Sequence, residues 1–204
     1  MTEVLRLCLE MEHHLLEDAR PSDYFNEICG DPLFQQHPFD MLHNLKKTMQ
    51  SPKHHPEGNV WNHTMLVVDE AAKVKSRSKN PTGFLWAALL HDIGKVPTTK
   101  NKKGKITSYN HDTVGAALAR EFLSQFTDDY VFIDEVCGLI RYHMQILYVL
   151  NGLPFADIEG MKRNTDIHEV VLLGLCDRLG RFHSNIKEEE KHIKQFLKAC
   201  ESVF

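Results

Sequence analysis

Six residues of this chain have side chains that bind divalent cations, and they are spread over more than a hundred positions: His63, His91, Asp92, His111, His143 and Asp177. Imidazole nitrogens and carboxylate oxygens are common ligands of such cations in proteins. Each of the six lies next to an apolar stretch with helical spacing, and a packed helix can hold a ligand rigidly. The pattern predicts a metallohydrolase.

The adjacent pair His91-Asp92 places a condition on the local structure. Neighbouring side chains on a helix point about 100° apart, so both can serve one site only where the helix ends. Gly94 provides such an end after the apolar run 84–90. A buried charged pair at this point would be costly without a cation or another partner.

Asp92 has two carboxylate oxygens and can therefore bridge two cations. We expect the first cation between the adjacent pair, His63 and Asp177, and the second between Asp92, His111 and His143. Two cations about 3.5–4 Å apart can polarise a phosphate and activate a water molecule.

The elements that must position these ligands are helical. The spacing of apolar residues predicts helices over residues 2–18, 22–29, 39–49, 60–75, 81–90, 112–125, 129–147, 165–182 and 187–200. No set of alternating strands emerges, so the fold class is all-α, with residues 1–50 as a helical N-terminal elaboration of a unit formed by residues 51–204. Residues 97–110 contain four lysines around Gly104, and we interpret them as a mobile basic loop beside the site without an element of its own.

Composition restricts the class of protein. The 204 residues suit one domain, and 24 basic against 28 acidic residues give a formal net charge of -4. This charge argues against an extended nucleic-acid partner without excluding a local basic groove. Five cysteines without a Cys-x-x-Cys pair indicate buried, reduced thiols. We find no signal-peptide core and no apolar run of membrane-spanning length, so we expect a cytoplasmic protein with no membrane partner.

The chain has 13 histidines, so chance groupings need weighing. A lone histidine on a helix is more often a surface or a satisfied core residue than a ligand, and we interpret seven of them in that way. His54 and His55 precede Pro56 in a loop, and they are either supporting groups near the metal or exposed side chains.

The order of His63, His91-Asp92 and Asp177 resembles the signature of the HD superfamily of metal-dependent phosphohydrolases. The segment His55-Pro-Glu-Gly-Asn-Val-Trp-Asn-His-Thr64 resembles more closely the HD domain of bacterial tRNA nucleotidyltransferases (CCA-adding). Further blocks agree with that branch, and the resemblance extends from about residue 32 to residue 181. These blocks are 91–95, His111 with Gly115, 141–143 and 176–181.

This resemblance implies an all-α HD-domain helical bundle and an enzyme. The nucleotidyltransferase head is absent from these 204 residues, so a CCA-adding activity is not expected. The activity implied is metal-dependent hydrolysis of phosphomonoesters or phosphodiesters, which in those enzymes includes nucleoside 2′,3′-cyclic phosphates and 2′-nucleotides. His111 and His143 resemble the additional ligands of two-metal HD proteins. We therefore expect one or two divalent ions (Mg, Mn, Co, Ni, Fe or Zn) and a nucleotide or a related small phosphate ester as substrate.

Charged residues near these ligands suggest further roles. Asp92 can orient or deprotonate the attacking water, and Lys95, three residues later, can reach a substrate phosphate and take part in catalysis. Arg178 and Arg181 offer forked donors to phosphate. Glu57 and Asn62 are expected to support His63 from behind.

Two other classes of function fit the same residues. One is a nucleotide-binding regulator that keeps metal and ligand without turnover. The other is an iron-dependent oxygenase on the HD fold, because some relatives use a similar His/Asp set for redox chemistry, and His111 and His143 leave this open.

Overall fold

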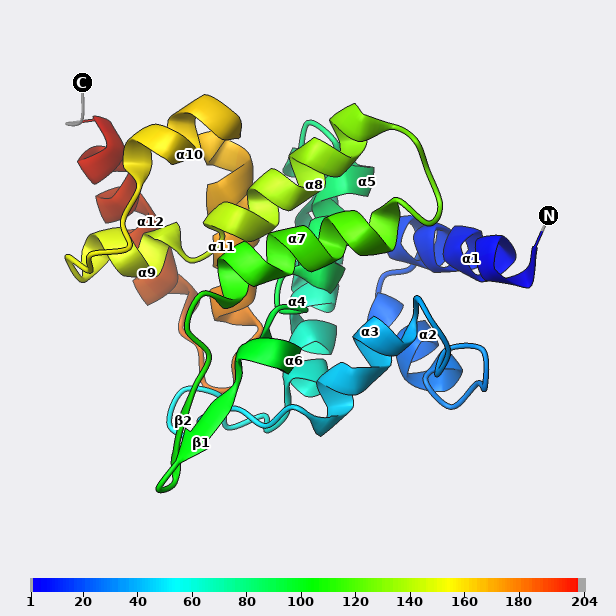
Figure 1. Cartoon of the computed structure of the whole chain (residues 1–204). Coiled ribbons are helices and arrows are strands. Elements are labelled where there is room, and N and C mark those ends of the chain that lie inside the picture. The colour runs from blue at the N-terminus through cyan, green and yellow to red at the C-terminus, as the bar shows by residue number, and fades with distance from the viewer. Residues whose placement is uncertain (1, 202–204) are drawn as a thin grey trace.

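The computed structural model describes residues 2–201, and these residues are helical apart from one short hairpin (Figure 1). The helices are α1 Glu3–Glu17, α2 Pro21–Ile28, α3 Asp40–His43, α4 Val60–Val74, α5 Pro81–Leu90, α6 Lys95–Thr98, α7 His111–Leu123, α8 Tyr130–Tyr142, α9 Gln145–Leu150, α10 Ile158–Asn164, α11 Ile167–Leu179 and α12 Ile186–Glu201. Two 3-10 turns, η1 Asn44–Lys47 and η2 Lys75–Arg77, and two strands, β1 Lys100–Lys102 and β2 Lys105–Thr107, complete the elements. The prediction of an all-α helical fold is confirmed.

The centre of the molecule is α5. Asn80 caps it by accepting a hydrogen bond from the backbone N–H of Gly83 (3.1 Å), and Pro81 occupies its first turn, as predicted. Every residue from Gly83 to Leu90 is buried, because α1, α4, α8 and α11 pack around this helix. A helix that is apolar on all sides can only be stable in such a position. It gives the following turn a rigid base.

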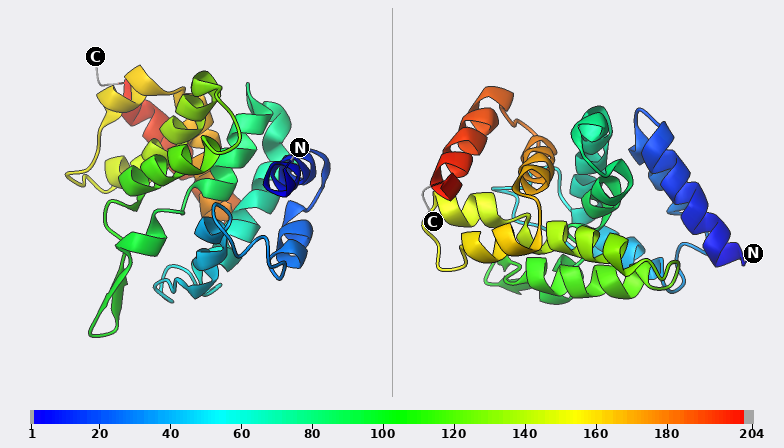
Figure 2. Two further views of the ribbon diagram at one scale, coloured as in Figure 1. Left: turned by 45° about the vertical axis from the view of Figure 1, so that its right-hand side comes forward. Right: turned by 90° about the horizontal axis from the view of Figure 1, so that it is seen from above.

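The N-terminal helices are part of the same hydrophobic core. In the view from above, α1 lies alongside the pair α4 and α5, and α12 lies at the opposite end of the molecule (Figure 2). Side chains such as Met11 and Phe25 belong to one continuous buried cluster with Trp61, Trp86 and Phe196. The boundary placed at residue 50 stays a prediction.

The structure differs from the sequence-based elements in four helical places. The helix expected over 39–49 is divided into α3 and η1, and the short helices α6 and α10 were not predicted. The helix expected over 129–147 ends at Tyr142, and α9 begins only at Gln145. No proline or glycine marks this break. The break places His143 just beyond the end of α8, where Nδ1 of its ring contacts the backbone carbonyl of Ile140.

The expectation that residues 97–110 contain no element is wrong. Strands β1 and β2 pair antiparallel, with Lys102 opposite Lys105, and the two residues between them have positive φ (Lys103 52°, Gly104 82°). Two such residues form the tight turn that matches the twist of a hairpin, and the glycine adopts its conformation without a steric cost. The hairpin projects from the body of the molecule (Figure 1).

Candidate metal centre

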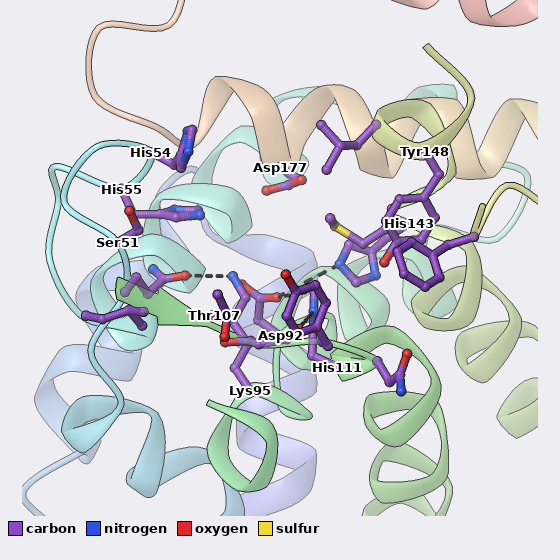
Figure 3. A pocket seen from close by; sticks show the side chains of 18 of the residues that line it. Ser51, His54, His55, Asp92, Lys95, Thr107, His111, His143, Tyr148 and Asp177 are labelled. Carbon is purple, nitrogen blue, oxygen red and sulfur yellow. Dashed lines mark hydrogen bonds and ion pairs between the residues drawn. The ribbon is translucent and has the colours of Figure 1, made fainter. Parts of the chain in front are cut away.

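All six predicted ligands meet at one place although they come from five elements. His63 lies in the first turn of α4, the His91-Asp92 pair in the turn after α5, His111 at the start of α7, His143 at the end of α8 and Asp177 in the last turn of α11. All six are buried, and four of them, Asp92, His111, His143 and Asp177, line a cavity (Figure 3). The remote spacing in the sequence therefore becomes one compact constellation.

Asp92 lies between two groups of imidazoles. Its Oδ2 is 3.3 Å from Nε2 of His91 and 3.8 Å from Nε2 of His63. Its Oδ1 is 3.5 Å from Nε2 of His111 and 3.9 Å from Nε2 of His143. Each oxygen thus faces a different pair of histidines, which is the arrangement that a bridging carboxylate requires.

Asp177 faces the His63 side of this centre. Its Oδ1 is 3.0 Å from Nε2 of His63, and Arg181 donates from Nη2 to both oxygens (3.1 and 3.0 Å). Burial raises the pKa of Asp177, but the Arg181 guanidinium and His63 outweigh burial and hold the pKa well below its usual range. Asp177 is therefore a carboxylate at neutral pH, the form that binds a cation.

Three of the ligand rings are oriented by the same kind of local hydrogen bond. His91, His111 and His143 each approach, through Nδ1, the backbone carbonyl of the residue three positions earlier. The acceptors are the carbonyl oxygens of Ala88 (2.8 Å), Ser108 (2.7 Å) and Ile140 (2.6 Å). A carbonyl can only accept, so Nδ1 carries the proton and Nε2 presents its lone pair to the centre.

Two of the histidines, His111 and His143, are in the neutral form that binds a metal. Burial and the neighbouring His111 and His91 lower the pKa of His143 to about 4, and burial also lowers the pKa of His111. Burial acts to lower the pKa of His63 as well, but the carboxylates of Asp177 and Glu57 raise it overall. The first two rings are neutral near pH 7, and the field around the third favours positive charge.

Glu57 contacts the Nδ1 side of the His63 ring, away from Asp92 and Asp177. One of its oxygens is 3.0 Å from Nδ1 of His63 and 2.8 Å from Nδ1 of His55, and Asn62 donates from its side chain to the Glu57 carbonyl (2.9 Å). Burial raises the pKa of Glu57, but hydrogen bonding, above all with His63, lowers it to about 2. The ionised carboxylate orients Nε2 of His63 toward Asp92 and Asp177.

The buried polar atoms at this place fit a metal. Oδ1 of Asp92, Nε2 of His91 and Nε2 of His111 are buried and have no hydrogen-bond partner in the structure. Such orphaned atoms are uncommon in proteins and call for an ion, a water or another partner. Within two sets, the ligand atoms lie no more than 4.8 Å from one another: His63, His91, Asp92, and Asp92, His111, His143. Asp92 belongs to both sets.

A cavity of about 600 Å³ opens beside the predicted ligands. Lys95 lines it and donates to Oδ2 of Asp92 and to Oε1 of Gln50, both at 2.6 Å. Arg181 lines it as well. Apolar and aromatic side chains line it too, among them Leu147, Tyr148, Leu153 and Phe155.

Arg178 is the predicted phosphate ligand that does not reach this cavity. Its guanidinium donates to Oε2 of Glu189 at 2.8 Å and so connects α11 to α12, and it does not line the cavity. Arg178 follows Asp177 directly on α11 and so points about 100° away from it, whereas Arg181, just beyond the end of the helix, donates to both oxygens of Asp177. We therefore correct the assignment of Arg178 from phosphate binding to helix packing.

Two polar residues at the site received no clear role from the sequence. His55, interpreted as either supporting or exposed, contacts Glu57 and lines the cavity, and burial lowers its pKa to about 3. The spacing of His55 and Glu57, two residues apart in a loop, was the available signal. Gln50 accepts a hydrogen bond from Lys95, and no feature of the sequence indicated this contact. Its position near Lys95 depends on how residues 44–60 fold back on themselves.

The sequence model of the HD domain family matches residues 60–181, more than half of the chain. The chain belongs to the HD domain family. This is a family of metal-dependent hydrolases, and the match covers all six ligands. The resemblance drawn from the sequence motifs is confirmed.

The similar proteins include several called "Multifunctional CCA protein". That of Actinobacillus pleuropneumoniae serotype 5b (strain L20) is 42% identical over 105 residues, which are 52% of this chain and 24% of the relative. That of Methylococcus capsulatus is 28% identical over 199 residues (97% and 40%), and that of Aromatoleum aromaticum is 39% identical over 139 residues (65% and 32%). The chain thus spans less than half the length of these relatives. Between residues 2 and 201, no helix has the length and apolar character needed to cross a bilayer.

Proposed function

We propose that this HD protein hydrolyses a nucleotide or a related small phosphate ester with water activated by two divalent cations. The observation that carries the proposal is the position of Asp92, whose two oxygens face two separate pairs of imidazoles at the floor of a cavity. The proposal assigns the activity to residues 51–204, with residues 1–50 as an elaboration.

The ligands divide between two cations. His63, His91, Asp92 and Asp177 would hold the first, and Asp92, His111 and His143 the second. Bound there, the cations would polarise a phosphate oxygen and lower the pKa of a coordinated water. Asp92, the carboxylate shared by both sets, would orient the attacking water.

Two cationic side chains can bind the phosphate. Lys95 uses two of its three N–H donors for Asp92 and Gln50, which leaves one for a phosphate oxygen. Nε of Arg181 is buried without a hydrogen-bond partner, so it can donate while Nη2 remains on Asp177. Donors held rigidly by such contacts stabilise developing charge without having to reorganise.

The cavity suits a nucleotide better than a bare phosphate. Its volume lies within the range of small-molecule sites, roughly 300–1,000 Å³. The apolar side chains that line it offer contact to a sugar and a base. A phosphate alone would leave this apolar surface in contact with water.

The test is phosphate release by protein stripped with EDTA and reloaded separately with Mg²⁺, Mn²⁺, Fe²⁺, Co²⁺, Ni²⁺ or Zn²⁺. Substrates are 2′-, 3′- and 5′-nucleotides, cyclic nucleotides and an aryl phosphate. We expect metal-restored turnover that Asp92→Ala abolishes while its circular dichroism remains that of the wild type. Turnover retained in Asp92→Ala would contradict the proposal.

The same experiment separates the other classes of function. Tight nucleotide binding by the metal-loaded protein without any product would indicate a regulator. Oxygen consumption that depends on bound iron would indicate an oxygenase. Elemental analysis of His91→Ala and His143→Ala, compared with the wild type, measures how many cations each side of Asp92 holds.

A further inference from the structure

A strongly basic segment borders the cavity. Between Asp92 and Asp112 the chain contains no acidic residue, and five lysines, Lys95, Lys100, Lys102, Lys103 and Lys105, lie in that interval. The last four belong to the projecting hairpin (Figure 1). The side chain of Asp112, which closes the interval, is paired with Arg141 at 2.9 Å. The local charge is therefore the opposite of the net charge of the whole chain.

The strand register gathers these lysines on one face. Residues that pair across the hairpin and residues two apart on a strand share a face, so Lys100, Lys102 and Lys105 point to the same side. Lys102 lies directly opposite Lys105, an arrangement that destabilises a pair of strands. No carboxylate among residues 2–201 lies within 4.0 Å of the ammonium groups of these three lysines. The face lacks a counter-charge from the described part of the chain.

This lysine face continues into the cavity. Lys105 and Thr107 of β2 line the cavity, and so do Lys53 and His54 of the loop beside it (Figure 3). That loop lies within a second interval, residues 41–56, that has no acidic residue. Among the residues that line the cavity, the only carboxylates are those of Asp92 and Asp177, both predicted metal ligands. A chain of phosphates that follows Lys105 and Lys53 into the cavity therefore meets no other carboxylate in its lining.

Exposed aromatic and apolar side chains lie beside the lysines. Tyr109, two residues after β2, lines the cavity and is 66% exposed. Phe155 (47%) and Leu147 (38%), which line the same cavity, are exposed as well. A positive track next to exposed aromatic rings is the arrangement that binds single-stranded nucleic acids, with phosphates on the lysines and bases stacked on the rings. A lipid surface also binds lysines and aromatic rings, but a bilayer does not enter a cavity, and Lys105, Tyr109 and Phe155 all line one.

We propose that the lysine face of the hairpin binds the phosphate backbone of a single-stranded oligonucleotide whose end enters the cavity. The claim about turnover rests on the proposed hydrolase function, but strand binding does not. The preferred substrate is then the terminal phosphate of a short strand rather than a free mononucleotide. Alternate residues of a strand are roughly 6.6 Å apart, comparable with the separation of successive phosphates in an extended strand.

The test measures strand binding and turnover separately. Binding is followed by the fluorescence anisotropy of labelled oligouridylates, from one to about eight nucleotides, with the full chain stripped of metal. The variant is the triple change Lys100→Gln, Lys102→Gln and Lys103→Gln, which leaves the cavity lining intact. The matched control carries the same charge change on exposed positions of α12, Lys191→Gln, Lys194→Gln and Lys198→Gln.

We expect wild-type affinity to rise with strand length and to fall with salt. Lys100 and Lys102 belong to the lysine face, and Lys103 lies in the turn beside it. Losing the two phosphate contacts of the face should reduce the slope of log Kd against log salt by about 1.4. The affinity advantage of the wild type over the variant then shrinks by roughly 7-fold between about 50 and 200 mM salt. The α12 control should behave as the wild type. With metal, kcat/KM should rise with strand length in the wild type and the control, and this rise should disappear in the hairpin variant.

Several results would overturn the inference. Affinity independent of strand length, or equal affinity in the hairpin variant and the wild type, would show that the hairpin binds no strand. Binding to phosphatidylserine vesicles that the hairpin changes abolish, with no binding to oligouridylate, would assign the lysines to a membrane instead. Strand binding with no hydrolysis of any phosphate ester would contradict the proposed function and leave the binding surface in place.

Discussion

Gly94 sits where two backbone segments come into contact, and its replacement by alanine tests how the metal centre is built. A Cβ on Gly94 would lie 2.1 Å from the carbonyl oxygen of His111 and 2.5 Å from the backbone N of Gly115. Ordinary contacts begin at 3.4 Å, so the turn that carries Asp92 and the start of α7 must separate by at least 1.3 Å (3.4 minus 2.1). Both clashing partners are backbone, so no side-chain rotation can relieve the overlap.

The size of the effect follows from two opposing contributions. Overpacking of this kind costs about 1–3 kcal/mol, and contact with backbone places Gly94→Ala at the upper end. Restricting the unfolded chain by adding a Cβ contributes about 0.4–1 kcal/mol in the opposite direction. The net loss is about 2 kcal/mol, which for a chain of this size lowers Tm by roughly 4–8 °C.

Metal affinity should fall together with stability. Asp92 moves with the turn and His111 with α7, whereas ligand distances tolerate changes of only about 0.2 Å. We expect the affinity of the centre to fall by at least about tenfold, the size of effect seen when supporting contacts of a metal are lost. Thermal melting by circular dichroism and calorimetric titration with Mn²⁺ measure the two effects.

Gly30→Ala is the matched control. A Cβ there meets only the Glu27 carbonyl oxygen at 3.9 Å, so the unfolded-state gain is kept without the clash. A Gly94→Ala protein that melts and binds Mn²⁺ as Gly30→Ala does would refute the claim that the close contact between the turn and α7 sets the geometry of the ligands.

Three further results are expected. Glu57→Gln should weaken metal binding by about 10–100-fold in calorimetry with little change in Tm, because the ionised partner of His63 is lost; unchanged affinity would contradict that role. Arg178→Gln should lower the free energy of unfolding by about 1–2 kcal/mol in urea melts, because it breaks the contact with Glu189, and should leave KM unaltered; a raised KM would restore the phosphate assignment. The five buried cysteines should not react with a thiol reagent until the protein is unfolded, because burial raises the pKa of Cys8 and Cys176 to about 12; rapid reaction of the native protein would contradict this.

The ligands could be predicted because each lies near a helix start, a helix end or an apolar run that can be recognised in the sequence. His91-Asp92 follows an apolar run with a capping asparagine before it and a glycine after it, and His63 follows the cap residue Asn59. These features depend on local chemistry, which is written in consecutive residues. The helical fold was predictable for the same reason.

The hairpin and the supporting residues depend on more distant contacts. The two strands have three residues each, are rich in lysine and therefore have low strand propensity, and neither has a buried face. The only sequence signal for the hairpin was the Lys103-Gly104 turn. Gln50 and His55 approach the site through the path of a loop, and Arg178 was misassigned because its partner Glu189 belongs to another helix. Such tertiary contacts leave no periodic trace in the sequence.

The Nδ1 contacts of the ligand rings bear on how the centre can change by mutation. His91, His111 and His143 are oriented by main-chain carbonyls, which every amino acid supplies, so no single substitution at the acceptor position deletes them. His63 alone among the four rings is oriented by a side chain, that of Glu57. Among residues other than the ligands, Glu57 is therefore the position where a point mutation most easily disturbs a ligand ring. Variants with altered metal preference should arise at this position first.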